Sequence, residues 1–165
     1  MDFLNGSFKV GRLFGIDIRV HILFVIWIAF RLFQSTNMKF TAMFLGMLFG
    51  IVLLHEFGHC FGARLVGGDA QNILMWPLGG LAYAYAPMRP WPQFVTVAAG
   101  PAVNVILAII SGVVYATAVG TFEWQWLNPL VGTPLYLNAP FWINALGTFF
   151  DVNIFLLAFN LLHLV

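Results

Sequence analysis

Four stretches of the chain are apolar over the length that a membrane-spanning helix needs, about 20 residues. They cover residues 18–36, 40–66, 92–119 and 139–165. Of the 165 residues, 61% are hydrophobic and only 8% are charged, whereas a soluble domain has about 25% charged residues. The sequence therefore predicts an all-α membrane protein, a polytopic helical bundle of four transmembrane spans in a lipid bilayer.

Four spans leave little of the 165 residues for an extramembrane domain, so we expect a single domain over residues 1–165. Residues 67–92 are rich in glycine and proline and contain "LAYAYA", an alternation typical of a strand. This segment predicts a short β-hairpin or a re-entrant loop between spans two and three. Residues 120–138 contain Trp124, Trp126 and Tyr136, aromatic side chains that favour the membrane interface, and predict a loop on that surface.

The basic residues indicate the orientation of the chain. If the N-terminus is cytoplasmic, five basic residues face the cytoplasm and two face the outside: Lys9, Arg12, Arg19, Arg64 and Arg89 against Arg31 and Lys39. Cytoplasmic loops carry an excess of Lys and Arg, so this orientation places residues 55–59 toward the cytoplasmic side. A formal net charge of +1 without a basic stripe argues against a nucleic acid partner.

The sequence "HEFGH", residues 55–59, interrupts the second apolar stretch with three ionisable side chains. Residues i and i+4 of a helix lie on one face about 6 Å apart along the axis, so His55 and His59 can bind one metal ion. Glu56 flanks that face. From there its carboxylate can take a proton from a metal-bound water and pass it to a leaving amine.

This motif also occurs by chance on the wet faces of soluble helices, where it binds nothing. Inside a span each ionisable residue costs roughly 2.5–3.5 kcal/mol on insertion scales, so metal binding is the favoured interpretation here. Two alternative functions are consistent with this pair of histidines. One is a membrane-embedded peptidase, and the other is a non-catalytic membrane metal-binding protein, such as a transporter or sensor, that uses His55 and His59.

Four motifs in order resemble the site-2 protease family of intramembrane zinc metalloproteases. They are "HEFGH" in a span, the glycine-rich "WPLGGLA", "AAGPAVN" at the start of the next span and "NIFLLAFNLL" in the last. The opening "GRLFGIDIRVHILF" is similar to that of bacterial and archaeal members. The resemblance implies a zinc endopeptidase of a prokaryotic cell membrane that cleaves a transmembrane segment of a single-span membrane protein.

The resemblance also implies roles for individual residues. It makes His55 and His59 ligands of Zn²⁺ and Glu56 the catalytic base, and it matches Asn104 to an asparagine that faces the active site. An amide there can donate a hydrogen bond to the developing oxyanion, although a helix–helix hydrogen bond explains it equally well.

The same resemblance matches Gly79 and Gly80 to a glycine pair in a loop that handles the substrate as an extended strand. Such a peptide can gain backbone hydrogen bonds by adding to a strand. Glycine pairs also serve ordinary turns.

A catalytic zinc site usually has three protein ligands, and the motif supplies two. In the family the third is an aspartate that would fall beyond Val165, so we expect a chain truncated within its last span. Within the chain, His163 is a possible third ligand by its depth, and it is equally well read as an interfacial histidine. Asp151 is the other candidate in that span. It precedes His163 by about 18 Å along the helix, which places it at the wrong depth. The sequence leaves homo-oligomerisation open.

Overall fold

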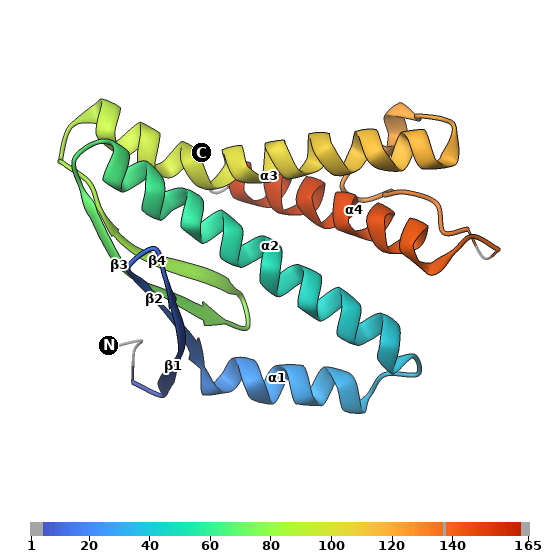
Figure 1. Ribbon diagram of the computed structural model, residues 1–165, viewed down its shortest axis with the longest axis horizontal. Coiled ribbons are helices and arrows are strands. Elements are labelled where there is room, and N and C mark those ends of the chain that lie inside the picture. Colours follow the sequence, from blue (N-terminus) through green and yellow to red (C-terminus); the bar gives the residue numbers. More distant parts are fainter. Residues whose placement is uncertain (1–4, 137, 163–165) are drawn as a thin grey trace. The chain divides into compact units, whose positions relative to one another are not determined.

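The computed structural model describes residues 5–136 and 138–162 (Figure 1). Its elements are, in chain order, β1 (Ser7–Leu13), β2 (Ile16–His21), α1 (Ile22–Phe33), α2 (Met38–Leu65), β3 (Asp69–Trp76), β4 (Gly79–Tyr85), α3 (Pro90–Val119), the 3₁₀ helix η1 (Trp124–Leu127) and α4 (Phe141–Leu162). Contacts along the chain divide it into two compact units, Met1–Gly100 and Pro101–Val165. The single domain stays a prediction.

Three helices are long and apolar enough to cross a membrane in the described part of the chain: α2, α3 and α4. They match the predicted spans at 40–66, 92–119 and 139–165, the last up to residue 162. Helix α1 has only 12 residues, a rise of about 18 Å against a hydrocarbon thickness of about 30 Å. The predicted count of four spans is therefore not confirmed, because the first apolar stretch begins as a strand.

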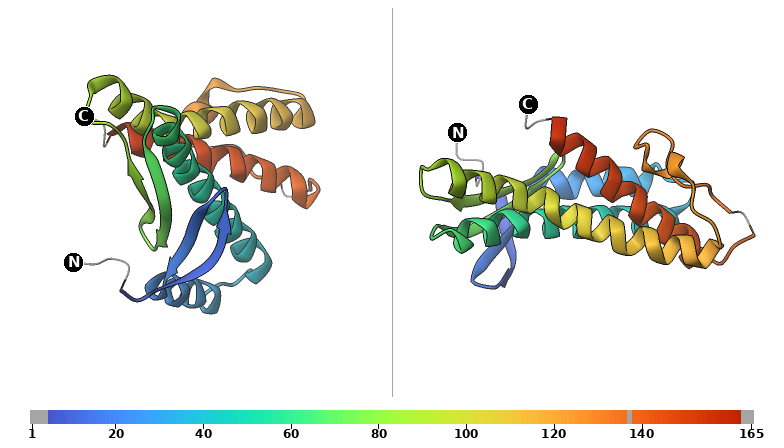
Figure 2. Two further views of the ribbon diagram at one scale, coloured as in Figure 1. Left: turned by 60° about the vertical axis from the view of Figure 1, so that its left-hand side comes forward. Right: turned by 90° about the horizontal axis from the view of Figure 1, so that it is seen from above.

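The prediction of an all-α fold is wrong in one respect, since the first unit contains a four-stranded sheet in the order β1-β2-β3-β4. The pairs β1–β2 and β3–β4 are antiparallel, and β2 and β3 are parallel. Parallel neighbours need a crossover connection, and here helices α1 and α2 provide it. Both views of Figure 2 show the two strand pairs beside helix α2. Strand β4 forms one edge of the sheet, and its "LAYAYA" pattern has the predicted strand conformation.

Strand β2 has an alternation of apolar and polar residues, which an average of hydropathy over a long window does not show. Ile16, Ile18 and Val20 are buried, while Asp17 and Arg19 between them are half-buried, the period of two typical of a strand with one buried face.

The turn before β2 is a two-residue connection with positive φ at both positions, 53° at Phe14 and 76° at Gly15. Two such residues make the type I′ turn that suits a hairpin. Residues 7–21 therefore form a hairpin that leads into α1. The predicted first span, residues 18–36, thus begins within strand β2.

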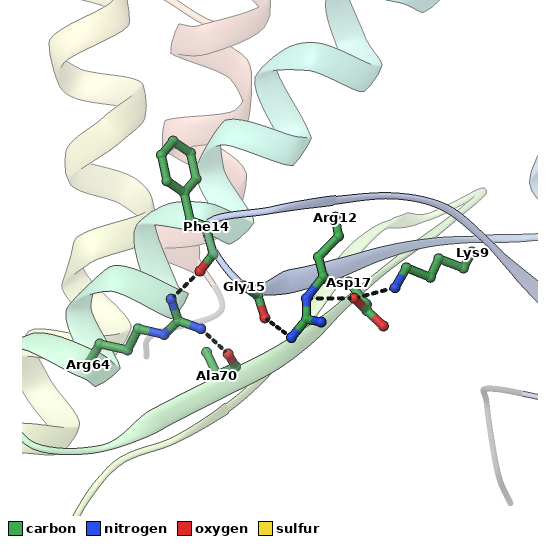
Figure 3. Close-up of polar contacts among 7 residues, drawn as sticks. All are labelled: Lys9, Arg12, Phe14, Gly15, Asp17, Arg64 and Ala70. Atoms are coloured by element: carbon green, nitrogen blue, oxygen red, sulfur yellow. Dashed lines mark hydrogen bonds and ion pairs between the residues drawn. The ribbon is translucent and has the colours of Figure 1, made fainter.

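Arg64, in the last turn of α2, links the turn of this hairpin to the start of strand β3 (Figure 3). Its two terminal nitrogens donate hydrogen bonds of 2.6 Å to the carbonyl oxygens of Phe14 and Ala70. The Phe14 ring also meets Phe57 and Phe61 of α2 edge-on, with centroid distances of 5.9 and 5.4 Å. These contacts hold a bulky residue in a left-handed conformation that is otherwise unfavourable.

We expect Arg64→Met to lower the free energy of unfolding by about 1.5–3 kcal/mol, because hydrogen bonds to a charged group contribute that much. Thermal unfolding of the purified protein in detergent would measure the loss, and amide exchange should rise first in residues 13–16. Arg89→Met, at an exposed arginine just before α3, is the control and should change the midpoint little. Equal midpoints for the two variants would contradict this role.

In the second unit, α3 and α4 run side by side and the 3₁₀ helix η1 packs against them (Figure 1). Trp126 is 1% exposed and meets Tyr115 edge-on at 5.2 Å. The prediction that residues 120–138 rest on the membrane surface is therefore wrong for Trp126, which fills the core of this unit. Trp124 is 80% exposed, as an interfacial side chain would be.

Candidate active site

The three ionisable residues of "HEFGH" lie in the C-terminal half of α2. His55 and Glu56 are buried, at 6% and 7% exposure, and His59 is half-buried. The apolar run around them keeps the helix continuous, so the i,i+4 spacing places both histidines on one face, as the sequence predicted.

The imidazole nitrogens of the two histidines converge. The Nε2 atoms of His55 and His59 lie 3.0 Å apart, and their ring planes are nearly perpendicular at 83°. Two nitrogens bound to one tetrahedral zinc at about 2.0–2.1 Å would lie about 3.3–3.4 Å apart. A shift of a few tenths of an ångström would therefore let both bind one ion.

Helix α3 orients the second histidine. The Nδ1 atom of His59 lies 2.8 Å from the carbonyl oxygen of Thr96. A carbonyl oxygen only accepts hydrogen bonds, so Nδ1 carries the proton and Nε2 keeps a lone pair directed toward His55. Metal-binding histidines are commonly held this way through the second ring nitrogen.

Gly100 gives the His59 ring its space. A Cβ atom at position 100 would lie 2.3 Å from Nε2 and 2.5 Å from Cε1 of His59. Any side chain larger than hydrogen would therefore displace the ring. Thr96 and Gly100 are one helical turn apart on the same face of α3, which explains how one helix contacts both sides of the imidazole.

Strand β4 contacts the carboxylate of Glu56. The backbone N–H of Ala82 donates a 2.8 Å hydrogen bond to Oε2 of Glu56. A Cβ atom at Gly80 would lie 2.3 Å from Cγ and 2.6 Å from Oε1 of the same side chain. Gly80 therefore leaves the room in which Glu56 reaches the strand.

The glycine pair predicted to handle substrate lies where β4 begins, at Gly79 and Gly80. Gly79 has φ +142°, and a Cβ atom there would meet nothing within 4 Å. The structure thus gives the two glycines different surroundings, an open turn and a contact with Glu56. Their role in substrate binding stays a prediction.

Asn104 lies in the second unit, where it is fully buried. Its Nδ2 donates a 3.1 Å hydrogen bond to Oδ1 of Asn153, and Nδ2 of Asn153 donates to the carbonyl oxygen of Phe149. This is the helix–helix hydrogen bond that the sequence left as one of two explanations. The catalytic role of Asn104 stays a prediction.

A third metal ligand is not identified. Across residues 5–136 and 138–162, no three His, Cys, Asp or Glu side chains gather as a metal site would require. Asp151 accepts hydrogen bonds of 2.9 Å from the N–H and the hydroxyl of Thr133, so it anchors the connection before α4. His163 lies outside the described residues.

The donor set fits part of a zinc site. Two imidazoles with converging nitrogens, one of them oriented by a carbonyl, are ligands that zinc prefers. The sequence predicted the histidine pair and Glu56 as site residues, but it did not predict the contacts that Thr96, Ala82 and Gly100 make with them. The glycine in "AAGPAVN" carried a weak signal, because a helix that packs closely against a ring needs a small residue at the contact. Thr96 and Ala82 act through backbone atoms, which no side-chain pattern reveals.

Comparison with known proteins points to one family. The model of peptidase family M50 matches residues 43–164. A zinc metalloprotease of Methanocaldococcus jannaschii is 31% identical over 109 residues, which cover 65% of this chain and 32% of that protein. A candidate zinc metalloprotease of Synechocystis is 30% identical over 119 residues, 64% of this chain and 31% of that protein.

Among solved structures, the site-2 protease from Methanocaldococcus jannaschii aligns with a TM-score of 0.69 and 27% identity, covering 94% of this chain and 64% of that one. The chain thus spans about a third of the length of the two curated relatives. The family match covers most of the chain, including the histidine pair and Glu56. This chain belongs to peptidase family M50, the site-2 proteases.

Proposed function

We propose that the chain is the catalytic core of an intramembrane zinc endopeptidase. The observation that carries the proposal is the pair of Nε2 atoms of His55 and His59, 3.0 Å apart on a buried stretch of an apolar helix. Glu56 follows His55 directly, so a carboxylate is available beside the metal ligands. Peptide hydrolysis needs such a combination of metal ligands and a proton-transfer group.

His55 and His59 hold the zinc ion, and Thr96 keeps the His59 ring in the tautomer that can bind it. When bound, zinc supplies Lewis acidity that polarises the peptide carbonyl and activates water. A carboxylate oxygen of Glu56 takes the proton of the attacking water. The same oxygen then gives that proton to the amide nitrogen that leaves, so Glu56 returns to its ionised state.

Strand β4 supports an extended substrate. A peptide bond within a transmembrane helix is shielded by the hydrogen-bonded turn around it, so the substrate must unwind before cleavage. An unwound segment has free backbone groups, and pairing with the edge of a sheet can satisfy them. Strand β4 is that edge, and it contacts the Glu56 side chain.

The substrate we propose is a single-span membrane protein, cleaved within or next to its span. Three long apolar helices in a family of membrane proteases support a location in a membrane. The excess of basic residues on one side supports a cytoplasmic N-terminus and an active site nearer the cytoplasm.

The experiment combines a zinc measurement with a cleavage assay in liposomes, using a single-span protein with a cytoplasmic domain as the test substrate. We expect His55→Ala and His59→Ala each to lose zinc and cleavage. His21→Ala is the matched control, because His21 accepts a hydrogen bond from the N–H of Leu23 at the start of α1. It should keep both zinc and cleavage.

Two results would contradict the proposal. If the wild-type protein binds no zinc, the histidine pair is not a metal site. If it binds zinc and no single-span substrate is cut while zinc crosses the membrane, the chain is a metal-binding or transport protein.

A further inference from the structure

The edge of β4 that faces away from β3 carries backbone groups able to pair with a peptide. In a strand the N–H and C=O groups of alternate residues point to the same side. Because the N–H of Ala82 donates to Glu56 rather than to β3, the backbone groups of Gly80, Ala82 and Ala84 point to this outer edge. The sheet has no further strand beyond β4 in the described part of the chain.

Glu56 occupies the middle of that edge. In residues 5–136 and 138–162 its carboxylate makes one hydrogen bond, the 2.8 Å bond from Ala82. The absence of a side chain at Gly80 lets Glu56 pass over the strand and reach that N–H. Gly80 and Ala84, two residues to either side, present the same kind of group without such an acceptor from Glu56.

A backbone N–H is a single donor, so Ala82 cannot bond strongly to Glu56 and to a peptide carbonyl at once. We propose that the N–H of Ala82 engages the Glu56 carboxylate on β4, and that an extended peptide pairing with this edge takes the N–H and releases the carboxylate to the histidine pair. This inference rests on the proposed function for the kind of ligand, an extended peptide.

The released carboxylate remains beside the metal ligands. Glu56 precedes His59 by three residues, and side chains at i and i+3 are neighbours on a helix surface. Three rotatable bonds let the carboxylate turn from the strand toward that face. Substrate docking and availability of the base are then coupled, and such coupling is reciprocal. Removing the carboxylate must therefore strengthen peptide binding.

The test measures binding without turnover. The probe is a labelled peptide of about six residues, built from alternating threonine and valine with a lysine at each end. We expect Glu56→Ala to bind the peptide at least about tenfold more tightly than the wild type does. In this variant the peptide no longer competes with a charged carboxylate for the N–H of Ala82. Glu56→Gln keeps an uncharged acceptor of the same shape and should fall between the two.

Two controls make the result specific. The same peptide with N-methyl groups on alternate residues cannot pair along one edge, and its affinity should not depend on residue 56. Amide exchange should show the Ala82 N–H protected in the wild type and unprotected in Glu56→Ala, with the Ala84 N–H unchanged.

Equal affinity of the wild type and Glu56→Ala overturns the inference. So does an equal gain for the N-methylated peptide, a failure of Glu56→Ala to bind the probe at millimolar concentration, or unchanged exchange at Ala82. Because no cleavage is measured, these results are independent of whether the protein is a protease, which the liposome assay decides.

Discussion

Glu56→Gln should lower the rate of peptide cleavage by about 10²–10⁴-fold, the usual contribution of a general acid–base group, while the protein keeps its zinc. Glutamine has the same shape, and its amide oxygen can still accept the hydrogen bond from Ala82. It cannot take a proton from water. Because neither histidine is touched, the zinc content and its dissociation constant should match those of the wild type.

Turnover of a single-span substrate in liposomes, with zinc measured on the same samples, separates the two effects. Glu123→Gln is the matched control, since Glu123 is an exposed carboxylate in the second unit. It should leave both quantities unchanged. Cleavage by Glu56→Gln at the wild-type rate would exclude Glu56 as the base.

Gly100→Ala is expected to weaken zinc binding by about 10- to 100-fold, the range seen when the partners that orient a metal ligand are changed. The new methyl group would lie 2.3 Å from Nε2 of His59, far inside van der Waals contact, so the ring has to move. Movement breaks the hydrogen bond from Nδ1 to Thr96 or turns the Nε2 lone pair away from His55. Competition with a chelator would measure the zinc dissociation constant.

Gly46→Ala provides the comparison, because Gly46 is also a helical glycine and a Cβ atom there meets nothing within 4 Å. Alanine is the better helix former by about 1 kcal/mol, so this variant should be as stable as the wild type or more stable, with unchanged zinc binding. If Gly100→Ala bound zinc like Gly46→Ala, the His59 ring would not be held where the structure has it.

The three long helices could be predicted from the sequence to within a few residues, because each is a predominantly apolar run of spanning length. The hairpin at residues 7–21 could not be separated from the first run in the same way. A window that averages hydropathy responds to Ile16, Ile18 and Val20 and ignores their period. The parallel pairing of β2 with β3 joins residues more than fifty positions apart, and no local pattern encodes it.

In the candidate site, too, the local features could be predicted from the sequence and the long-range contacts could not. His55, Glu56 and His59 are four residues apart at most, so helix geometry alone brings them together. The partners of these side chains come from 26 and 37 positions further along the chain, at Ala82 and Thr96. Both partners use backbone atoms, whose position depends on the folded chain and not on residue type. The sequence therefore predicted the candidate site residues but not the backbone groups that orient them.

The short helix α1 has a consequence for the depth of the sheet. It leaves β2 and reaches the turn at residues 34–37 after about 18 Å, and α2 returns over 28 residues, about 42 Å. With that turn at one membrane surface, the end of β2 that joins α1 lies about 12 Å short of the other surface of a 30 Å hydrocarbon layer. With α1 along the membrane normal, part of the sheet would then lie below the headgroups.

Backbone donors at that depth have little water to bind, and each one left without a partner costs several kcal/mol. The edge of β4 is where such a cost would arise. At that depth, a carboxylate on α2 that accepts from the edge would offset part of this cost, and Glu56 would then stabilise the sheet in the bilayer even without a substrate.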